Sequence, residues 1–130
     1  MPEMSVKHTE GVASVMAARG HQVRVDTPPA MGGQDSGPTP VELLTGALGS
    51  CIVFYVARWA REAGVPYAGM EVKLDYVLDM EAHCVPVINV DIRMPAGFPQ
   101  DRRESLLRVA EHCTVHNTLC SPPRITVTVA

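Results

Sequence analysis

The sequence predicts an α+β fold with antiparallel sheet, formed by a single domain that covers residues 1–130. Segments that alternate apolar and polar residues come in adjacent pairs, as in antiparallel hairpins, and only two helical segments separate them. The composition, with 46% hydrophobic and 19% charged residues, is typical of a chain that buries its own core. The predicted order is strand, strand, helix, strand, strand, helix, strand.

The N-terminal part is expected to hold two strands, over residues 12–17 and 21–26, joined by a turn at Arg19-Gly20. Residues 27–40 follow and are rich in proline and glycine, which predicts a loop. Loops of this length in compact domains tend to be functional or mobile.

The first helix has a well-marked start. Thr39 is expected at the N-cap and Pro40 at the first helical position, and Glu42 completes a capping box. Apolar residues then recur at helical spacing until Gly64 ends the helix. The face expected to be buried comprises Leu44, Leu48, Cys51, Ile52, Tyr55 and Trp59.

This helix is apolar around much of its circumference, so one sheet face would not cover it. Two glycines and a serine, Gly46, Gly49 and Ser50, leave room for a second helix to approach closely. A helical glycine costs roughly 1 kcal/mol relative to alanine, so the open space is expected to have a use. We therefore predict a homodimer in which the same helix of a second subunit packs here.

The C-terminal half predicts two strands, a helix and a final strand. Residues 70–80 and 87–94 alternate cleanly and should pair antiparallel, each with one dry face. Asp101 and Glu104 can cap a helix whose apolar face runs to Cys113. Residues 124–130 should close the chain as a strand. The residues expected to face inward are Met70, Val72, Leu74, Tyr76, Leu78, Ile88, Val90, Ile92, Met94, Ile125, Val127 and Val129.

Charge and hydropathy exclude several functional classes. The net charge of −3 offers no basic surface for nucleic acid or for an anionic membrane. No signal peptide opens the chain, and the longest strongly apolar run, residues 52–57, falls far short of a membrane span. We therefore expect a cytoplasmic protein with no membrane partner.

The cysteine pattern leaves two interpretations of Cys51 open. It is either a small core residue, as most buried free cysteines are, or a reactive thiolate in the space cleared by its small neighbours. A reactive Cys51 requires a cationic neighbour, preferably an arginine, because apolar burial opposes ionisation. Cys113 is expected on the same core from the second helix, and a disulfide becomes possible if the two Cα atoms lie within about 7 Å.

A metal site is the alternative for the C-terminal cysteines. Cys113, His116 and Cys120 have the spacing C-x2-H-x3-C, with His112 adjacent, and all are zinc-ligand types. A structural zinc site normally has two ligand pairs, and this cluster offers one. A thiol role without a bound metal or cofactor is therefore favoured. Cys84 receives no function.

Two segments together resemble the OsmC/Ohr family: "GPTPVELLTGALGSC" and "LLRVAEHCTVHNTL". The resemblance extends from about Val23 to Val129 and is closest to the less characterised OsmC-like subgroup. It implies an intertwined homodimer in which antiparallel sheets wrap central helices. It also implies that Cys51 reduces an organic hydroperoxide, that Cys113 resolves the sulfenic acid as a disulfide, and that a dithiol, such as a lipoylated protein, reduces the disulfide.

The sequence departs from the peroxidase members of that family at two places. Their N-terminal arginine has no counterpart in "HTEGV", and Val41 stands where they carry a glutamate ten residues before the cysteine. Arg19 or Arg24 can substitute for the arginine. We favour Arg19, because a turn can reach across a subunit interface, although an ordinary solvated charge explains either residue. Glu42 can orient an arginine, although its capping duty also explains it. The rival expectation is a non-redox protein that binds a small apolar ligand in the interfacial pocket.

Overall fold

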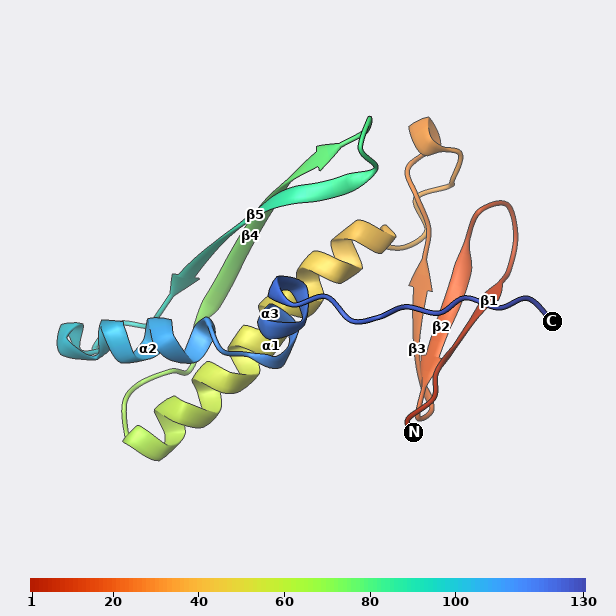
Figure 1. Cartoon of the computed structure of the whole chain (residues 1–130). Coiled ribbons are helices and arrows are strands. Elements are labelled where there is room, and N and C mark those ends of the chain that lie inside the picture. Colours follow the sequence, from red (N-terminus) through yellow and green to blue (C-terminus); the bar gives the residue numbers. More distant parts are fainter. The chain divides into compact units, whose positions relative to one another are not determined.

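The computed structural model describes residues 1–130 and confirms a mixed α+β fold with antiparallel sheets. The chain forms two compact units, Met1–Leu44 and Thr45–Ala130. Helix α1, Pro40–Ala63, begins in the first unit and continues through the second (Figure 1).

The first unit holds a three-stranded sheet in the order β1-β2-β3, with strands Ser5–His8, Ser14–Ala18 and His21–Val25. The two predicted strands are confirmed as β2 and β3, joined at Arg19-Gly20, where both residues have positive φ (50° and 83°). Strand β1 was not predicted. Its four residues are all exposed and include a single apolar side chain, so it carries no pattern of alternation, and it forms by pairing with β2.

The predicted loop between β3 and α1 is confirmed and is organised by the carboxylate of Asp26, which is only 3% exposed. Asp26 accepts backbone N–H bonds from Thr27 (2.8 Å), Gln34 (3.1 Å) and Ser36 (3.1 Å), and the Ser36 hydroxyl donates at 2.6 Å. A short 3-10 helix, Pro29–Met31, lies within the loop. One buried side chain therefore satisfies backbone groups that have no sheet or helix partner.

Helix α1 begins and ends as predicted. The Thr39 N–H donates to Glu42 Oε1 (2.8 Å), and the Glu42 N–H donates to Thr39 Oγ1 (3.1 Å), which completes the capping box. Gly64 follows the helix with φ 71°. Leu44, expected to be buried, is exposed, because the buried face follows a different line along the helix. That face consists of Thr45, Leu48, Gly49, Ile52, Val56 and Ala60.

By length and composition alone, α1 would be long and apolar enough to cross a membrane. The core helix of a soluble protein passes the same test. Here Leu48, Ile52 and Val56 are buried in the core of the second unit, whereas Leu44, Val53 and Phe54 of the same helix remain exposed.

The β4–β5 hairpin of the second unit confirms the predicted strand pair. Strands Glu71–Asp79 and Cys84–Arg93 run antiparallel, with Leu74 opposite Val90. Helix α1 approaches β4 at Gly49, where an added Cβ would lie 2.6 Å from Leu74 Cδ1. Leu78 and Val90 were expected to face inward against the core but are exposed. Val90 instead lines an open cavity.

The predicted second helix is two helices. A 3-10 turn, Gln100–Arg102, leads into α2, Arg103–Ala110, and helix α3, Thr114–Cys120, follows after a break. The expected caps Asp101 and Glu104 do not cap, because the N-cap positions are Pro99 and Arg102, neither of which makes a side-chain cap bond. Figure 1 shows α3 against the middle of α1.

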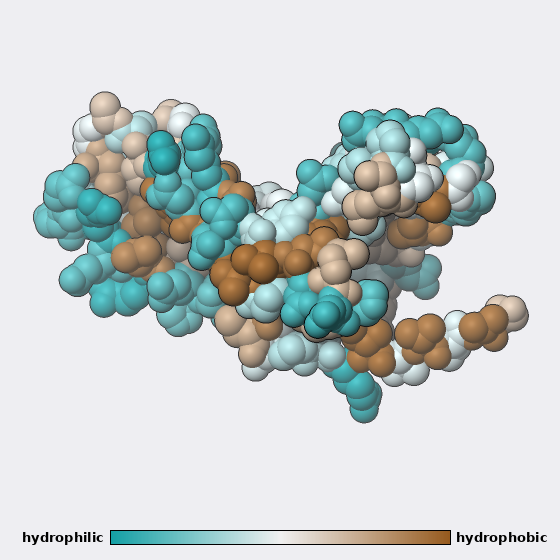
Figure 2. Space-filling view, turned by 90° about the horizontal axis from the view of Figure 1, so that it is seen from above, coloured by the Kyte–Doolittle hydropathy of each residue, from teal (hydrophilic) through white to brown (hydrophobic).

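The predicted C-terminal strand does not form within this chain. Residues 121–130 have no regular structure, and Ile125, Val127 and Val129 are 78%, 84% and 95% exposed. These apolar side chains lie along a projecting tail in Figure 2. The alternation expected of a strand is present, but no strand of the protomer pairs with it.

Candidate functional site

Two free thiols from separate elements meet in the core of the second unit. Cys51 lies on α1 and is half-buried, whereas Cys113 lies in the break between α2 and α3 and is fully buried. Cys113 belongs to a cluster with Ile52, Val56 and Ala110, and Cys51 packs against this cluster. The expectation that both cysteines face one core is confirmed, although Cys113 does not lie on the helix predicted for it.

Consecutive backbone N–H groups at the start of α3 donate to the two sulfurs. The Val115 N–H donates to Cys51 Sγ at 3.5 Å, and the His116 N–H donates to Cys113 Sγ at 3.3 Å. Cys113 accepts this bond because it is the N-cap of α3, with extended backbone (φ −73°, ψ 157°). Such bonds favour a sulfur that carries negative charge over one that does not.

The two thiols are not equivalent. Burial raises the pKa of Cys113, the His116 N–H opposes this rise, and the hydrogen bond and charge of Cys51 add to it. Cys113 is therefore held as a protonated thiol at neutral pH. Cys51 is the more exposed member of the pair.

Neither sulfur accepts a hydrogen bond from an arginine of the same chain. Arg19 is exposed at the β2–β3 turn in the first unit. Arg24 is already engaged, since it pairs with Glu10 and its Nε donates to Ser36 Oγ at 2.8 Å. The protomer therefore supplies no direct guanidinium contact to the thiols.

Glu42, the remaining predicted site residue, is occupied at one of its oxygens. Its Oε1 accepts the Thr39 N–H of the capping box, and Glu42 forms no ion pair in the protomer. The capping duty is thus established, and the second carboxylate oxygen has no hydrogen-bond partner within the chain.

Sequence reasoning missed a polar contact beside the thiols. The hydroxyls of Tyr55 and Thr114 lie 2.7 Å apart and join α1 to α3. The guanidinium carbon of Arg58 lies 5.0 Å from the centre of the Tyr55 ring and 5.3 Å from that of Phe54. The available signal was helical spacing, because residues 51, 55 and 58 share one face of α1.

The candidate zinc ligands of the C-terminal region lie in different environments. Cys113 Sγ is buried, whereas Cys120 is exposed with its Sγ 3.9 Å from His116 Nδ1. No group of three or more His, Cys, Asp or Glu side chains is arranged to hold a metal ion. Cys84 lies exposed at the start of β5.

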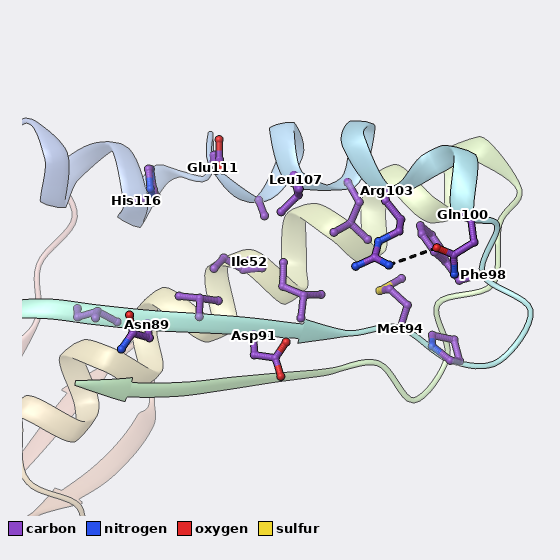
Figure 3. Close-up of a pocket in the computed structure, with 16 residues that line it drawn as sticks. Ile52, Asn89, Asp91, Met94, Phe98, Gln100, Arg103, Leu107, Glu111 and His116 are labelled. Atoms are coloured by element: carbon purple, nitrogen blue, oxygen red, sulfur yellow. Dashed lines mark hydrogen bonds between the residues drawn. The ribbon is translucent and has the colours of Figure 1, made fainter. Parts of the chain in front are cut away.

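A cavity of about 620 Å³ lies beside the thiols, between β5 and α2, with Ile52 of α1 in its wall. Figure 3 shows His116 and Glu111 at one end and Phe98 and Gln100 at the other. Arg103 extends into the cavity and donates to Gln100 Oε1 at 3.2 Å. Ile52 of the buried face of α1 lines this cavity, whereas Leu48 does not. His116 connects the cavity with the thiol pair, because its side chain lines the cavity and its N–H donates to Cys113 Sγ.

The thiol-bearing segments lie within a region that matches a known family. The model of the OsmC-like protein family matches residues 33–128, which include both cysteines and all of α1, β4, β5, α2 and α3. This chain belongs to the OsmC-like family. The family expected from the two sequence segments is thereby confirmed. No curated protein sequence matches the chain significantly.

Solved structures confirm the family fold at low sequence identity. A Psychrobacter arcticus protein described as an osmotic stress induced and detoxification response protein superposes with a TM-score of 0.84 at 18% identity, over 91% of this chain and 88% of that one. The organic hydroperoxide resistance protein OsmC of Legionella pneumophila gives 0.66 at 14% identity, over 92% and 88%. OhrB of Bacillus subtilis, an organic hydroperoxide resistance protein, gives 0.61 at 14% identity, over 94% and 92%.

Proposed function

We propose that this OsmC-like protein reduces organic hydroperoxides with Cys51 as the nucleophile and Cys113 as the resolving thiol. One observation carries the proposal: an accessible thiol and a buried thiol from different elements interact, and each sulfur accepts a backbone N–H from α3. The hydroperoxide resistance proteins among the structural neighbours support the choice of substrate class.

In the proposed reaction, the Cys51 thiolate attacks the terminal oxygen of the hydroperoxide. The O–O bond breaks, the alkoxide takes a proton to leave as the alcohol, and Cys51 becomes a sulfenic acid. The Cys113 thiol then loses its proton and attacks Cys51 Sγ, and the hydroxyl group leaves as water. The resulting disulfide is reduced by an external dithiol through thiol–disulfide exchange, which restores both thiols and oxidises the dithiol. A lipoylated protein has the required chemistry.

The substrate in this proposal is an apolar organic or lipid hydroperoxide. The apolar part of the cavity wall, which includes Ile52, Val90 and Phe98, offers a surface for an apolar group, and Asp91, Arg103 and Glu111 line the same cavity with charged groups. Capture of the sulfenic acid by a buried neighbour also limits further oxidation.

The working form is proposed to be an intertwined, cytoplasmic homodimer in which each chain contributes one OsmC-like domain, residues 1–130. Exposed apolar side chains on α1 (Leu44, Val53 and Phe54) and along residues 125–129 support a partner of the same kind, since a free protomer would leave them in water. In this assembly Arg19 would stabilise the Cys51 thiolate across the interface, and the unoccupied oxygen of Glu42 would orient that arginine.

The test is turnover of cumene hydroperoxide or tert-butyl hydroperoxide with a dithiol reductant. Cys51→Ser should abolish turnover, whereas Cys84→Ser, a matched change at an exposed cysteine, should leave it at the parental rate. Cys113→Ser should form the sulfenic acid but no intramolecular disulfide. A Cys51→Ser variant as active as the parent would refute the assignment.

The rival function is binding of a small apolar ligand without a redox cycle. The lack of a guanidinium on either sulfur in the protomer favours it, as does a cavity whose lining omits Cys51. Intact-mass measurement after one equivalent of hydroperoxide separates the two functions. The reductase loses two hydrogens per subunit through the Cys51–Cys113 bond, and the binding protein keeps its mass.

A further inference from the structure

The contact between Tyr55 and Thr114 has no part in the reaction proposed above, yet it joins the same two helices as the contact at Cys51. We infer that Tyr55 is a positioning residue for the reactive thiol. Its hydroxyl holds Thr114, and thereby holds α3 where the Val115 N–H reaches Cys51 Sγ. This inference rests on the proposed thiol chemistry of Cys51.

Two contacts in register join the helices. On α1, Cys51 and Tyr55 are one turn apart, and on α3 their partners, Val115 and Thr114, are neighbours in the chain. The contacts differ in strength. The hydroxyl pair lies at 2.7 Å, the usual length of a good O–H···O bond, whereas the N–H to sulfur bond is 3.5 Å long and sulfur is a weak acceptor. The oxygen contact is therefore the one able to set the position of the sulfur contact.

Helix α3 needs such a contact, because little else holds it. The helix has seven residues, none of them buried, and Leu119 faces solvent. Only Val115 packs against the core cluster. So short a helix is unstable by itself in water, so its position must come from tertiary contacts.

Arg58 and Phe54 both contact the Tyr55 ring. The Arg58 guanidinium lies 5.0 Å from the ring centre, and Phe54 meets the same ring edge to face with centres 5.1 Å apart. The guanidinium also lies 5.3 Å from the centre of the Phe54 ring, so Arg58, Phe54 and Tyr55 form one cluster on α1, and the Tyr55 hydroxyl extends from this cluster to Thr114 of α3.

The test compares Tyr55→Phe with Thr114→Val, since each removes one hydroxyl of the pair and keeps the size of the side chain. The first readout is the rate at which iodoacetamide alkylates Cys51 at neutral pH, located by peptide mass. Both variants should react about tenfold more slowly, because the thiolate loses a hydrogen bond of the charge-assisted kind. The double variant should fall no further than either single one.

Conservative variants separate positioning from a general loss of structure. Thr114→Ser keeps the hydroxyl and should restore the parental rate. Tyr76→Phe removes a hydroxyl from β4 that makes no hydrogen bond and should change nothing. Amide hydrogen exchange is the second readout: in Tyr55→Phe it should quicken at Val115 and stay unchanged at Val56 in the core of α1. Should Tyr55→Phe fail to fold, the Thr114→Val and Thr114→Ser pair carries the same comparison.

The outcomes distinguish this inference from the proposed function. Parental alkylation rates in Tyr55→Phe and Thr114→Val would overturn the positioning role, even if the parent turns over hydroperoxide. Slow alkylation in both variants would uphold the role, even if the parent failed to reduce any hydroperoxide.

Discussion

Glu42 has an established duty as a helix cap and a proposed duty in orienting an arginine, and two substitutions separate them. Glu42→Gln keeps an acceptor for the Thr39 N–H but removes the charge. The lost interaction with the helix dipole is worth about 0.3–1 kcal/mol at low ionic strength and is largely screened at high salt. Thr39→Ala instead removes the acceptor of the Glu42 N–H, a bond of 3.1 Å, which costs about 1 kcal/mol. In a chain of 130 residues that cost lowers Tm by about 4 °C.

The assay pairs thermal unfolding at roughly 0.5 M NaCl, where the Debye length is only a few ångströms, with hydroperoxide turnover at 25 °C. Glu42→Gln should unfold within about 0.5 kcal/mol of the parent and lose about tenfold to a hundredfold in turnover, the loss typical of a misplaced catalytic group. Thr39→Ala should instead lose about 1 kcal/mol of stability and keep the parental turnover. Parental turnover in Glu42→Gln would show that Glu42 serves only as a helix-capping residue and does not orient an arginine. A loss of stability equal to that of Thr39→Ala would refute the view that glutamine preserves the capping box.

Three further predictions concern other parts of the chain. The Ser36 hydroxyl and three backbone N–H groups hold the pKa of Asp26 far below its usual value. The stabilisation of the fold by the ionised Asp26 is therefore complete at neutral pH and is lost as the pH falls below about 4. Asp26→Asn should flatten the pH dependence of urea unfolding in this range. Gly37→Ala should lower the free energy of unfolding by about 1–3 kcal/mol in urea titration, because the new Cβ overlaps a backbone carbonyl of β3; parental stability would contradict this. Val127→Asp should weaken self-association in sedimentation velocity about tenfold, whereas Thr126→Asp, on the opposite face of the segment, should have little effect. Equal effects of the two substitutions would refute the view that residues 125–129 pair as a strand with the partner chain.

The elements that sequence predicted well are those set by near neighbours. The capping box depends on residues three positions apart, and both of its hydrogen bonds form. The turn at Arg19-Gly20 depends on two adjacent residues that accept positive φ. The β4–β5 hairpin follows from an alternation of period two over residues 71–76 of β4 and 88–93 of β5.

The elements that sequence mispredicted depend on partners far along the chain or outside it. Strand β1 has no apolar pattern and forms through its pairing with β2. The C-terminal segment has the opposite property: Ile125, Val127 and Val129 alternate as a strand should, but the protomer offers no edge that pairs with them. An alternating pattern predicts a strand with one apolar and one polar face, but it does not indicate which chain supplies the neighbouring strand.

The break before α3 explains why the residues of the site were easier to name than its geometry. Leu106, Ala110 and Cys113 are spaced four and three apart, so their pattern alone predicts a helix that continues through Cys113. In such a helix the N–H of His116 would be bound to a carbonyl of the preceding turn and could not reach a sulfur. Because the chain becomes extended at Cys113 and a new helix starts at Thr114, the first amides of α3 have no partner within the helix and are free to donate to Cys51 and Cys113. The hydrogen bonds that favour thiol chemistry therefore exist only because the predicted helix is interrupted, and the interruption is held by contacts 59 and 64 positions apart that no local pattern encodes.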